Sequence, residues 1–182
     1  MIAEAQQEAE LRSHKAPLAQ HMLSSVDELR EHETTVVDKS PCISIARRGA
    51  HLTRSAPGTK HEVLIIDDDA YFAVLVEKLL SFAGYAVRTA TNRLALSREL
   101  RKETLPHLII LDVELGKLSG FDVLTRLRRH ERFSFLPVIM LSAHVTRKDV
   151  SRGLLAGADG YVSKPCRFFA LNHAIRTVLD IH

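Results

Sequence analysis

Short apolar runs alternate with helix-like segments along most of the chain after residue 60, and this alternation restricts the fold more than any other feature. The runs lie at 63–66, 85–87, 108–111, 138–141 and 161–162. Uninterrupted apolar runs of this length predict strands buried on both faces, because a strand exposed on one face would alternate apolar and polar residues. Five successive strand–helix units predict an α/β fold with a parallel sheet.

The segments between the runs carry apolar residues at helical spacing and end at typical helix boundaries. Asn92 stands at a cap position, and Gly84 and Gly157 stand where helices would stop. The second helix is expected over 92–104, and apolar residues mark the others after Asp69, from about Phe121 to Arg132, around 150–157, and from about Phe168 to the end of the chain. The third carries a run of arginines, which we interpret as a solvated face; these are Arg126, Arg128, Arg129 and Arg132.

Polar residues follow four of the apolar runs. Asp67 and Asp68 follow the first, Asp112 the third, Ser142 the fourth, and Lys164 comes shortly after the fifth. The carboxyl ends of parallel strands share one edge of the sheet, so these side chains are expected to converge there. Two carboxylates about 4 Å apart repel by roughly 4 kcal/mol at an effective dielectric near 20. Such a cluster needs a cation, and oxygen ligands alone suit Mg²⁺.

The proposed task of Asp112 is to accept a phosphoryl group as a carboxylate nucleophile. Lys164 and Ser142 would supply an ammonium and a hydroxyl to the phosphoryl oxygens. Taken singly, each residue has a plainer interpretation: Asp69 as a helix cap, Ser142 as a turn residue and Lys164 as a solvated side chain. The joint occurrence at four strand ends favours one shared site.

Four motifs then resemble the receiver domain of two-component response regulators. They are IIDDD (65–69), LDVELGKLSG (111–120), MLSA (140–143) and ADGYVSKP (158–165). The spacings of 44, 30 and 22 residues between Asp68, Asp112, Ser142 and Lys164 are those of the family. The resemblance covers 61–182, leaves 1–60 as an N-terminal extension, and implies a doubly wound, flavodoxin-like, five-stranded parallel sheet of order 2-1-3-4-5 with helices on both faces.

The resemblance also implies a site and a function. Asp67, Asp68, Asp112 and the backbone carbonyl of Glu114 would hold Mg²⁺, and the peptide bond between Lys164 and the following proline would be cis. Asp112 would be phosphorylated by a sensor histidine kinase or a histidine phosphotransfer protein.

The same resemblance implies a switch. Ser142 would move toward the phosphate and Tyr161 would turn inward, changing the surface of the fourth helix, fifth strand and fifth helix. The expected role is a signalling switch that regulates a separate partner, with no enzymatic activity beyond its own phosphorylation and dephosphorylation. A plain half-buried strand aromatic is the alternative for Tyr161.

The sequence departs from the family pattern at one position, and two further residues stand at positions where the family itself varies. Gly116 stands where the family usually has proline, which predicts a more mobile loop. Glu114 and His144 stand two residues beyond Asp112 and Ser142, at positions where the family varies the lifetime of the phosphoryl group. A solvent-exposed loop histidine is the plainer interpretation of His144.

The first sixty residues differ from the rest in charge pattern. Residues 1–38 carry eight acidic and three basic residues, whereas 39–60 carry five basic and no acidic ones. Leu18, Met22, Val26 and Leu29 recur at helical spacing after Pro17, which predicts a short amphipathic helix. We expect a marginal or disordered extension with a basic linker, or else a docking or dimerisation arm.

Composition excludes several other classes. The chain has 182 residues, of which 46% are apolar and 26% charged, and it contains two cysteines. Two cysteines are too few for a disulfide framework, so we expect a reduced, cytoplasmic protein. No apolar run reaches the roughly 18 residues of a membrane span. The net charge is only +3 and aromatic residues make up 5% of the chain. Both values argue against a nucleic-acid-binding surface.

Three functions remain in competition. The first is a phosphorylation switch of the single-domain type, in which the output is a separate protein, the N-terminal arm, or a homodimer formed through the switch surface or the arm. The second is a receiver-shaped interaction module without phosphoryl turnover. The third is a Mg²⁺-dependent phosphatase of the haloacid dehalogenase type, which needs a second Asp where Glu114 stands.

Overall fold

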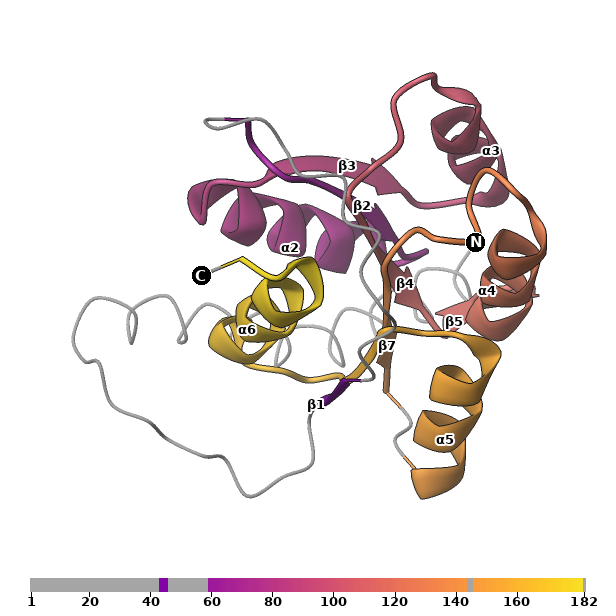
Figure 1. Cartoon of the computed structure of the whole chain (residues 1–182). Coiled ribbons are helices and arrows are strands. Elements are labelled where there is room, and N and C mark those ends of the chain that lie inside the picture. Colours follow the sequence, from indigo (N-terminus) through magenta and orange to yellow (C-terminus); the bar gives the residue numbers. More distant parts are fainter. Residues whose placement is uncertain (1–42, 46–58, 144–145, 182) are drawn as a thin grey trace, which may run out of the picture.

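A central sheet of five parallel strands and one antiparallel strand organises the computed structural model, which describes residues 43–45, 59–143 and 146–181 (Figure 1). The parallel strands are β2 (Glu62–Ile66), β3 (Ala86–Ala90), β4 (Leu108–Asp112), β7 (Val138–Ser142) and β8 (Gly160–Ser163). Their order is β3-β2-β4-β7-β8, which is the predicted order 2-1-3-4-5. All residues of β4 and β7 are buried, as their uninterrupted apolar runs predict.

The sixth strand, β1 (Ile43–Ile45), pairs antiparallel with β8. Ile43 lies opposite Val162, Ser44 opposite Tyr161 and Ile45 opposite Gly160. The sheet therefore has one strand more than predicted, and it comes from residues that were expected to form a linker. Three residues are too few to show a period, and pairing with β8 decides their conformation. The helix predicted after Pro17 and the rest of the extension lie outside the described residues.

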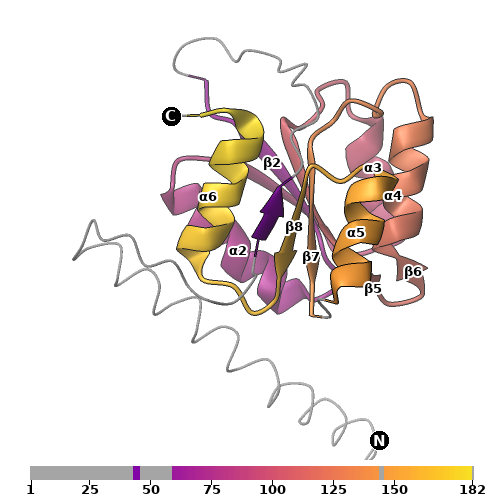
Figure 2. The same cartoon turned by 60° about the horizontal axis from the view of Figure 1, so that its bottom comes forward.

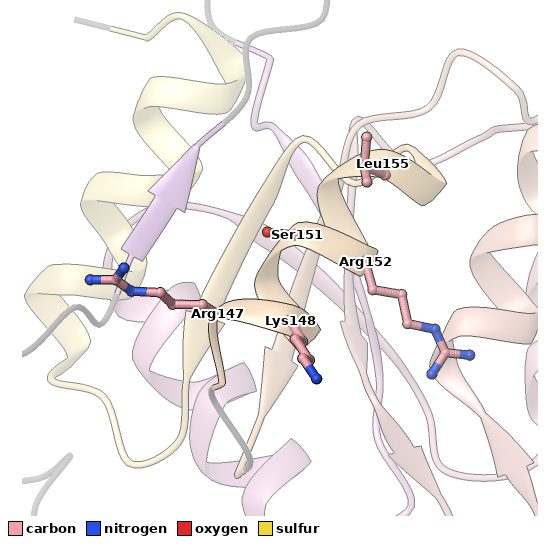
Figure 3. A pocket seen from close by; sticks show the side chains of 5 residues that line it. All are labelled: Arg147, Lys148, Ser151, Arg152 and Leu155. Carbon is pink, nitrogen blue, oxygen red and sulfur yellow. The ribbon is translucent and has the colours of Figure 1, made fainter.

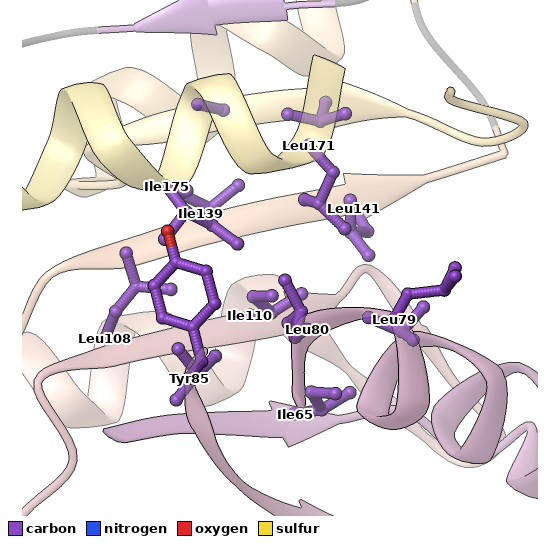
Figure 4. Packing of buried hydrophobic residues seen from close by; sticks show 14 of the residues in the cluster. Ile65, Leu79, Leu80, Tyr85, Leu108, Ile110, Ile139, Leu141, Leu171 and Ile175 are labelled. Carbon is purple, nitrogen blue, oxygen red and sulfur yellow. The ribbon is translucent and has the colours of Figure 1, made fainter. Parts of the chain in front are cut away.

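Helices cover both faces of the sheet, as predicted. Helices α2 (Ala70–Phe82) and α6 (Phe168–Leu179) pack on one face, and α3 (Arg93–Arg101), α4 (Gly120–Arg129) and α5 (Arg147–Ala156) lie on the other (Figure 2). The core under α2 and α6 is drawn in Figure 4, where Ile65, Ile110 and Ile139 of three strands meet residues of both helices. Each fully buried side chain of this size contributes about 1.5–3 kcal/mol.

Capping residues fix most of the helix ends at the predicted positions. The side chain of Asn92 accepts a hydrogen bond from the backbone of Ala95, and Gly84 and Gly157 have φ angles of 96° and 108°. The left-handed conformation of both glycines terminates the preceding helices. Helices α3 and α4 each end three residues before the predicted limit, at Arg101 and Arg129.

The prediction that the arginine run forms a solvated face is wrong for two of its four members. Arg128 forms an ion pair with Asp159 at 2.9 Å and donates to the carbonyls of Gly157 and Leu136. Arg132 lies beyond α4 and donates to the backbone carbonyl of Glu103. Both arginines tie loops together, a role that depends on tertiary contacts and that helical spacing alone does not reveal.

Within the described part of the chain, no helix combines the length and the apolar character needed to cross a membrane.

Candidate functional site at the carboxyl ends of the strands

Three of the four polar strand ends predicted to converge are in contact, and the fourth, Ser142, ends the neighbouring strand β7 at the same edge of the sheet. Asp67 follows β2, Asp112 ends β4, Ser142 ends β7, and Lys164 follows β8. Asp67, Asp112 and Ser142 are 1%, 6% and 0% exposed. The Lys164 ammonium lies 2.6 Å from Asp67 Oδ2 and 3.2 Å from Asp112 Oδ1, so one cation bridges the ends of two strands from a third.

Three carboxylates form the predicted metal-binding group. One oxygen from each of Asp67, Asp68 and Asp112 lies within 4.8 Å of the other two, with Asp68 exposed and the other pair buried. The donors are all hard carboxylate oxygens, which is the chemistry that Mg²⁺ prefers. Three acidic groups at this separation, with one nearby ammonium, leave an excess of negative charge. The residues therefore fit a divalent cation. The predicted fourth ligand, the carbonyl of Glu114, stays a prediction.

Burial and neighbouring charges shift the pKa of Asp67, Asp112 and Lys164. Loss of hydration raises the pKa of Asp112 to about 6, and the Asp67 carboxylate adds to the rise while Lys164 opposes it. Burial likewise raises the pKa of Asp67. Burial by itself lowers the pKa of Lys164, but the two adjacent carboxylates outweigh it and the net shift is upward. Lys164 is thus held as a cation beside a carboxylate that loses its proton near neutral pH.

Asp69 has the plainer of the two roles weighed for it. Its side chain caps α2 by accepting from the backbone N–H groups of Tyr71 and Phe72, at 3.1 and 3.3 Å. Its own N–H donates to Asp67 Oδ1 at 2.9 Å. Asp69 therefore begins the helix and orients the Asp67 carboxylate.

Two contributions to the site were not predicted. The Lys164 ammonium lies 4.3 Å from the centroid of the Phe72 ring. This cation–π contact stabilises the positive charge. Phe72 was visible only as one member of an apolar helical stripe. A Cβ on Gly120 would lie 2.1 Å from the backbone oxygen of Asp112, so only glycine allows α4 to begin against this strand end.

The Gly116 loop forms a short hairpin. Strands β5 (Glu114–Leu115) and β6 (Leu118–Ser119) pair antiparallel, and Gly116 takes a φ of 59°. A Cβ on Gly116 would lie 3.4 Å from Asp68 Oδ2. The Glu114 backbone N–H donates to the Asp112 carboxylate, which lowers the pKa of Asp112 against the effect of burial. The mobility predicted for this loop is untested.

Tyr161 points into the core, with 1% of its surface exposed. Burial raises the pKa of Tyr161, and a hydrogen bond with the Ser142 side chain partly offsets that rise. The ring lies directly under α5, where a Cβ on Gly153 would come within 2.8 Å of Tyr161 Cδ2. The two residues predicted to form the switch are therefore in contact. His144 lies outside the described residues.

A doubly wound sheet with a buried Asp–Lys pair and an acidic cluster at its strand ends defines a flavodoxin-like α/β class with an acidic pocket at the topological switch point. Within this class the chain belongs to the response regulator receiver domain family, whose pattern it matches over residues 63–176. The predicted family is confirmed.

Individual relatives agree with this assignment. The chain is 43% identical to the DNA-binding dual master transcriptional regulator RpaA of Synechocystis over 103 residues, 57% of this chain and 42% of that protein. It is 41% identical to the transcriptional regulatory protein AfsQ1 of Streptomyces coelicolor over 120 residues, 64% of this chain and 50% of the relative. The chain spans about half the length of the curated relatives it matches.

Solved structures show the same fold. A response regulator of Chloroflexus aurantiacus is 33% identical, with a TM-score of 0.62, over 67% of this chain and 99% of that one. The chemotaxis response regulator CheY4 of Vibrio cholerae is 30% identical, with a TM-score of 0.61, over 66% of this chain and 100% of that one.

Proposed function

We propose that this chain is a signalling switch in which Asp112 accepts a phosphoryl group from the phosphohistidine of a sensor histidine kinase or a phosphotransfer protein. The observation that carries the proposal is the contact between the buried Asp112 carboxylate and the Lys164 ammonium at 3.2 Å, beside two further carboxylates. A structural ion pair would need one carboxylate, whereas phosphoryl transfer needs a nucleophile, a fixed cation and a metal site.

Each side chain has a distinct part in the transfer. An Asp112 oxygen attacks phosphorus, the phosphorus–nitrogen bond to the donor imidazole breaks, and the bond electrons leave with the ring nitrogen. Lys164 and Ser142 interact with the phosphoryl oxygens. Asp67, Asp68 and Asp112 would hold Mg²⁺, which supplies positive charge beside the incoming phosphate. With a pKa of about 6, Asp112 is largely ionised above pH 7 and can act as the nucleophile.

The contact between Ser142 and Tyr161 supports the second half of the proposal. Tyr161 is already inward without a phosphoryl group, with 1% of its surface exposed, and it shares a hydrogen bond with Ser142. A phosphoryl group that draws Ser142 would therefore act on the contacts that hold the Tyr161 ring. This changes the surface formed by α5, β8 and α6, which we take as the output surface. The chain acts as a regulator with no enzymatic activity on other substrates, and its downstream partner is a separate protein.

The proposal is tested by incubating the full chain with a small-molecule phosphodonor and Mg²⁺ and measuring its intact mass. The wild type should gain one base-labile phosphoryl group, and Asp112→Asn should gain none. Asp122→Asn, an exposed aspartate at the start of α4, is the matched control and should behave as wild type.

Two results contradict the proposal and point elsewhere. No gain in mass by the wild type would favour an interaction module without phosphoryl turnover. Steady release of phosphate from many organic monoesters would favour a phosphatase.

A further inference from the structure

Strand β1 brings the N-terminal part of the chain to the output surface. Because β1 runs antiparallel to β8, Ile43 lies opposite Val162, near the carboxyl end of β8, and Ile45 lies opposite Gly160 at the other end (Figure 2). Ile45 packs against the core between the sheet and α6. The chain therefore enters β1 at the edge of the sheet that carries the functional site.

Helix α5 begins at this same edge and presents a shallow, open basic surface, which we call the basic groove. The groove has a volume of about 500 Å³ and is lined by five residues; these are Arg147, Lys148, Ser151, Arg152 and Leu155. Figure 3 shows Arg147 and Arg152 extending to either side of the helix, with Lys148 between them. The lining includes three cationic side chains and no acidic one. Leu155, which is 84% exposed, adds an apolar contact point.

The groove has the opposite charge to the residues that lead into β1. Residues 18–38 hold five acidic residues and one basic residue, and the predicted amphipathic helix carries an apolar stripe that would suit Leu155. Four residues separate Asp38 from Ile43. An extended chain covers about 3.5 Å per residue, so the ten steps from Glu33 to Ile43 span up to about 35 Å. That exceeds the roughly 15 Å length of a ten-residue helix such as α5.

We propose that the acidic segment 18–38 docks on the basic groove of α5 within the same chain, so that β1 and this segment together cover the output surface. Attachment through β1 places the acidic segment beside the groove at an effective concentration in the millimolar range. A second copy or another protein that uses the α5–β8 surface must then displace it. Docking itself does not depend on phosphorylation of Asp112, and only its regulatory meaning rests on the proposed function.

Zero-length carbodiimide cross-linking of the full chain tests the docking. Lys148 should form amide bonds with carboxylates of 18–38 about tenfold more often than Lys78, which is also exposed and lies on α2 at the opposite face of the sheet. High salt should remove the preference, because it screens exposed charges. In a mixture of isotopically light and heavy chains, the cross-links should join residues of one chain. Equal yields at the two lysines, or cross-links mainly between chains, would overturn the proposal.

Hydrogen exchange gives a second measurement that does not rely on reactive carboxylates. The double variant Ser44→Pro/Ile45→Pro removes pairing capacity from β1, and α5 and β8 should then exchange about threefold or more faster. Ile45→Val preserves a β-branched residue and is the matched control. Peptides from β4 report that the fold is intact. Unchanged exchange of α5 in the proline variant would contradict the docking, whether or not Asp112 can be phosphorylated.

Discussion

Asp112 is held in an environment where burial favours its neutral form, although the Lys164 ammonium partly opposes this effect. The Asp112 pKa of about 6 in the folded chain exceeds the ordinary 3.8, so the folded state binds more protons than the unfolded state between these values. The free energy of unfolding therefore falls as pH rises through this window. Above it, the ionised carboxylate destabilises the folded state by up to about 3 kcal/mol, at about 1.4 kcal/mol per pKa unit.

Asp112→Asn should accordingly stabilise the metal-free protein at pH 7.5. The gain should be about 1–3 kcal/mol and should largely disappear at pH 4, where the wild-type side chain is protonated. Denaturant unfolding in the presence of a chelator measures both values, with Asp122→Asn as the control. A variant that is no more stable than the wild type at pH 7.5 would show that Asp112 is not strained by burial.

Asp68 should contribute to metal affinity and little to folding. It is the exposed member of the acidic cluster, so Asp68→Asn should leave metal-free stability nearly unchanged. Mg²⁺ at 100 times its dissociation constant should stabilise the wild type by about 2.7 kcal/mol, and the same concentration should stabilise the variant much less. Thermal unfolding against MgCl₂ measures this. Equal stabilisation of both proteins would remove Asp68 from the metal site.

Gly153 controls the space available to Tyr161. In Gly153→Ala the new Cβ would lie 2.8 Å from the Tyr161 ring, so the ring must shift outward. The cost of overpacking, about 1–3 kcal/mol, should exceed the gain in helix propensity of about 1 kcal/mol. Fluorine NMR of 3-fluorotyrosine protein should show greater solvent exposure of Tyr161, with Ser151→Ala as the control. An unmoved resonance would mean that α5 yields instead of the ring.

At the scale of elements, strand ends were predictable and cross-element contacts were not. Asp67, Asp112, Ser142 and Lys164 could be placed because apolar runs locate buried strands, and parallel strands end at a common edge. The position of Phe72 under Lys164 could not, because an apolar residue in a helical stripe carries no sign of a cation nearby. Strand β1 was missed because three residues form a strand only through their partner, β8.

Arg128 connects α4 to the loops that contain Leu136 and Gly157. Arg128→Met should lower the free energy of unfolding by about 2 kcal/mol, because Asp159 and two carbonyls lose a charged donor. Arg126 is an exposed member of the same arginine run. Arg126→Met should change the free energy of unfolding by less than about 0.5 kcal/mol. Urea unfolding of both variants gives the comparison. Equal effects would restore the interpretation of the whole run as a solvated face.

At the scale of the whole molecule, the site and the output surface lie on neighbouring parts of one sheet. Ser142 ends β7 and contacts Tyr161 of β8, and β8 is covered by β1 from the N-terminal extension. Under the proposed function, a change at Asp112 would reach the outer edge of the sheet through these two adjacent strands. The sequence indicated which residues gather at the strand ends, but the contact that β1 makes between the predicted 1–60 extension and the receiver depends on pairing that no local pattern encodes.

The most direct test of this account is to find which residue carries the phosphoryl group. Phosphorylated protein is treated with borohydride, which reduces an aspartyl phosphate to homoserine, and its peptides are then mapped by mass. The account predicts homoserine at position 112 alone, formed only when Mg²⁺ is present. Modification at Asp67 or Asp68, or none at all in protein that has gained phosphate, would contradict it.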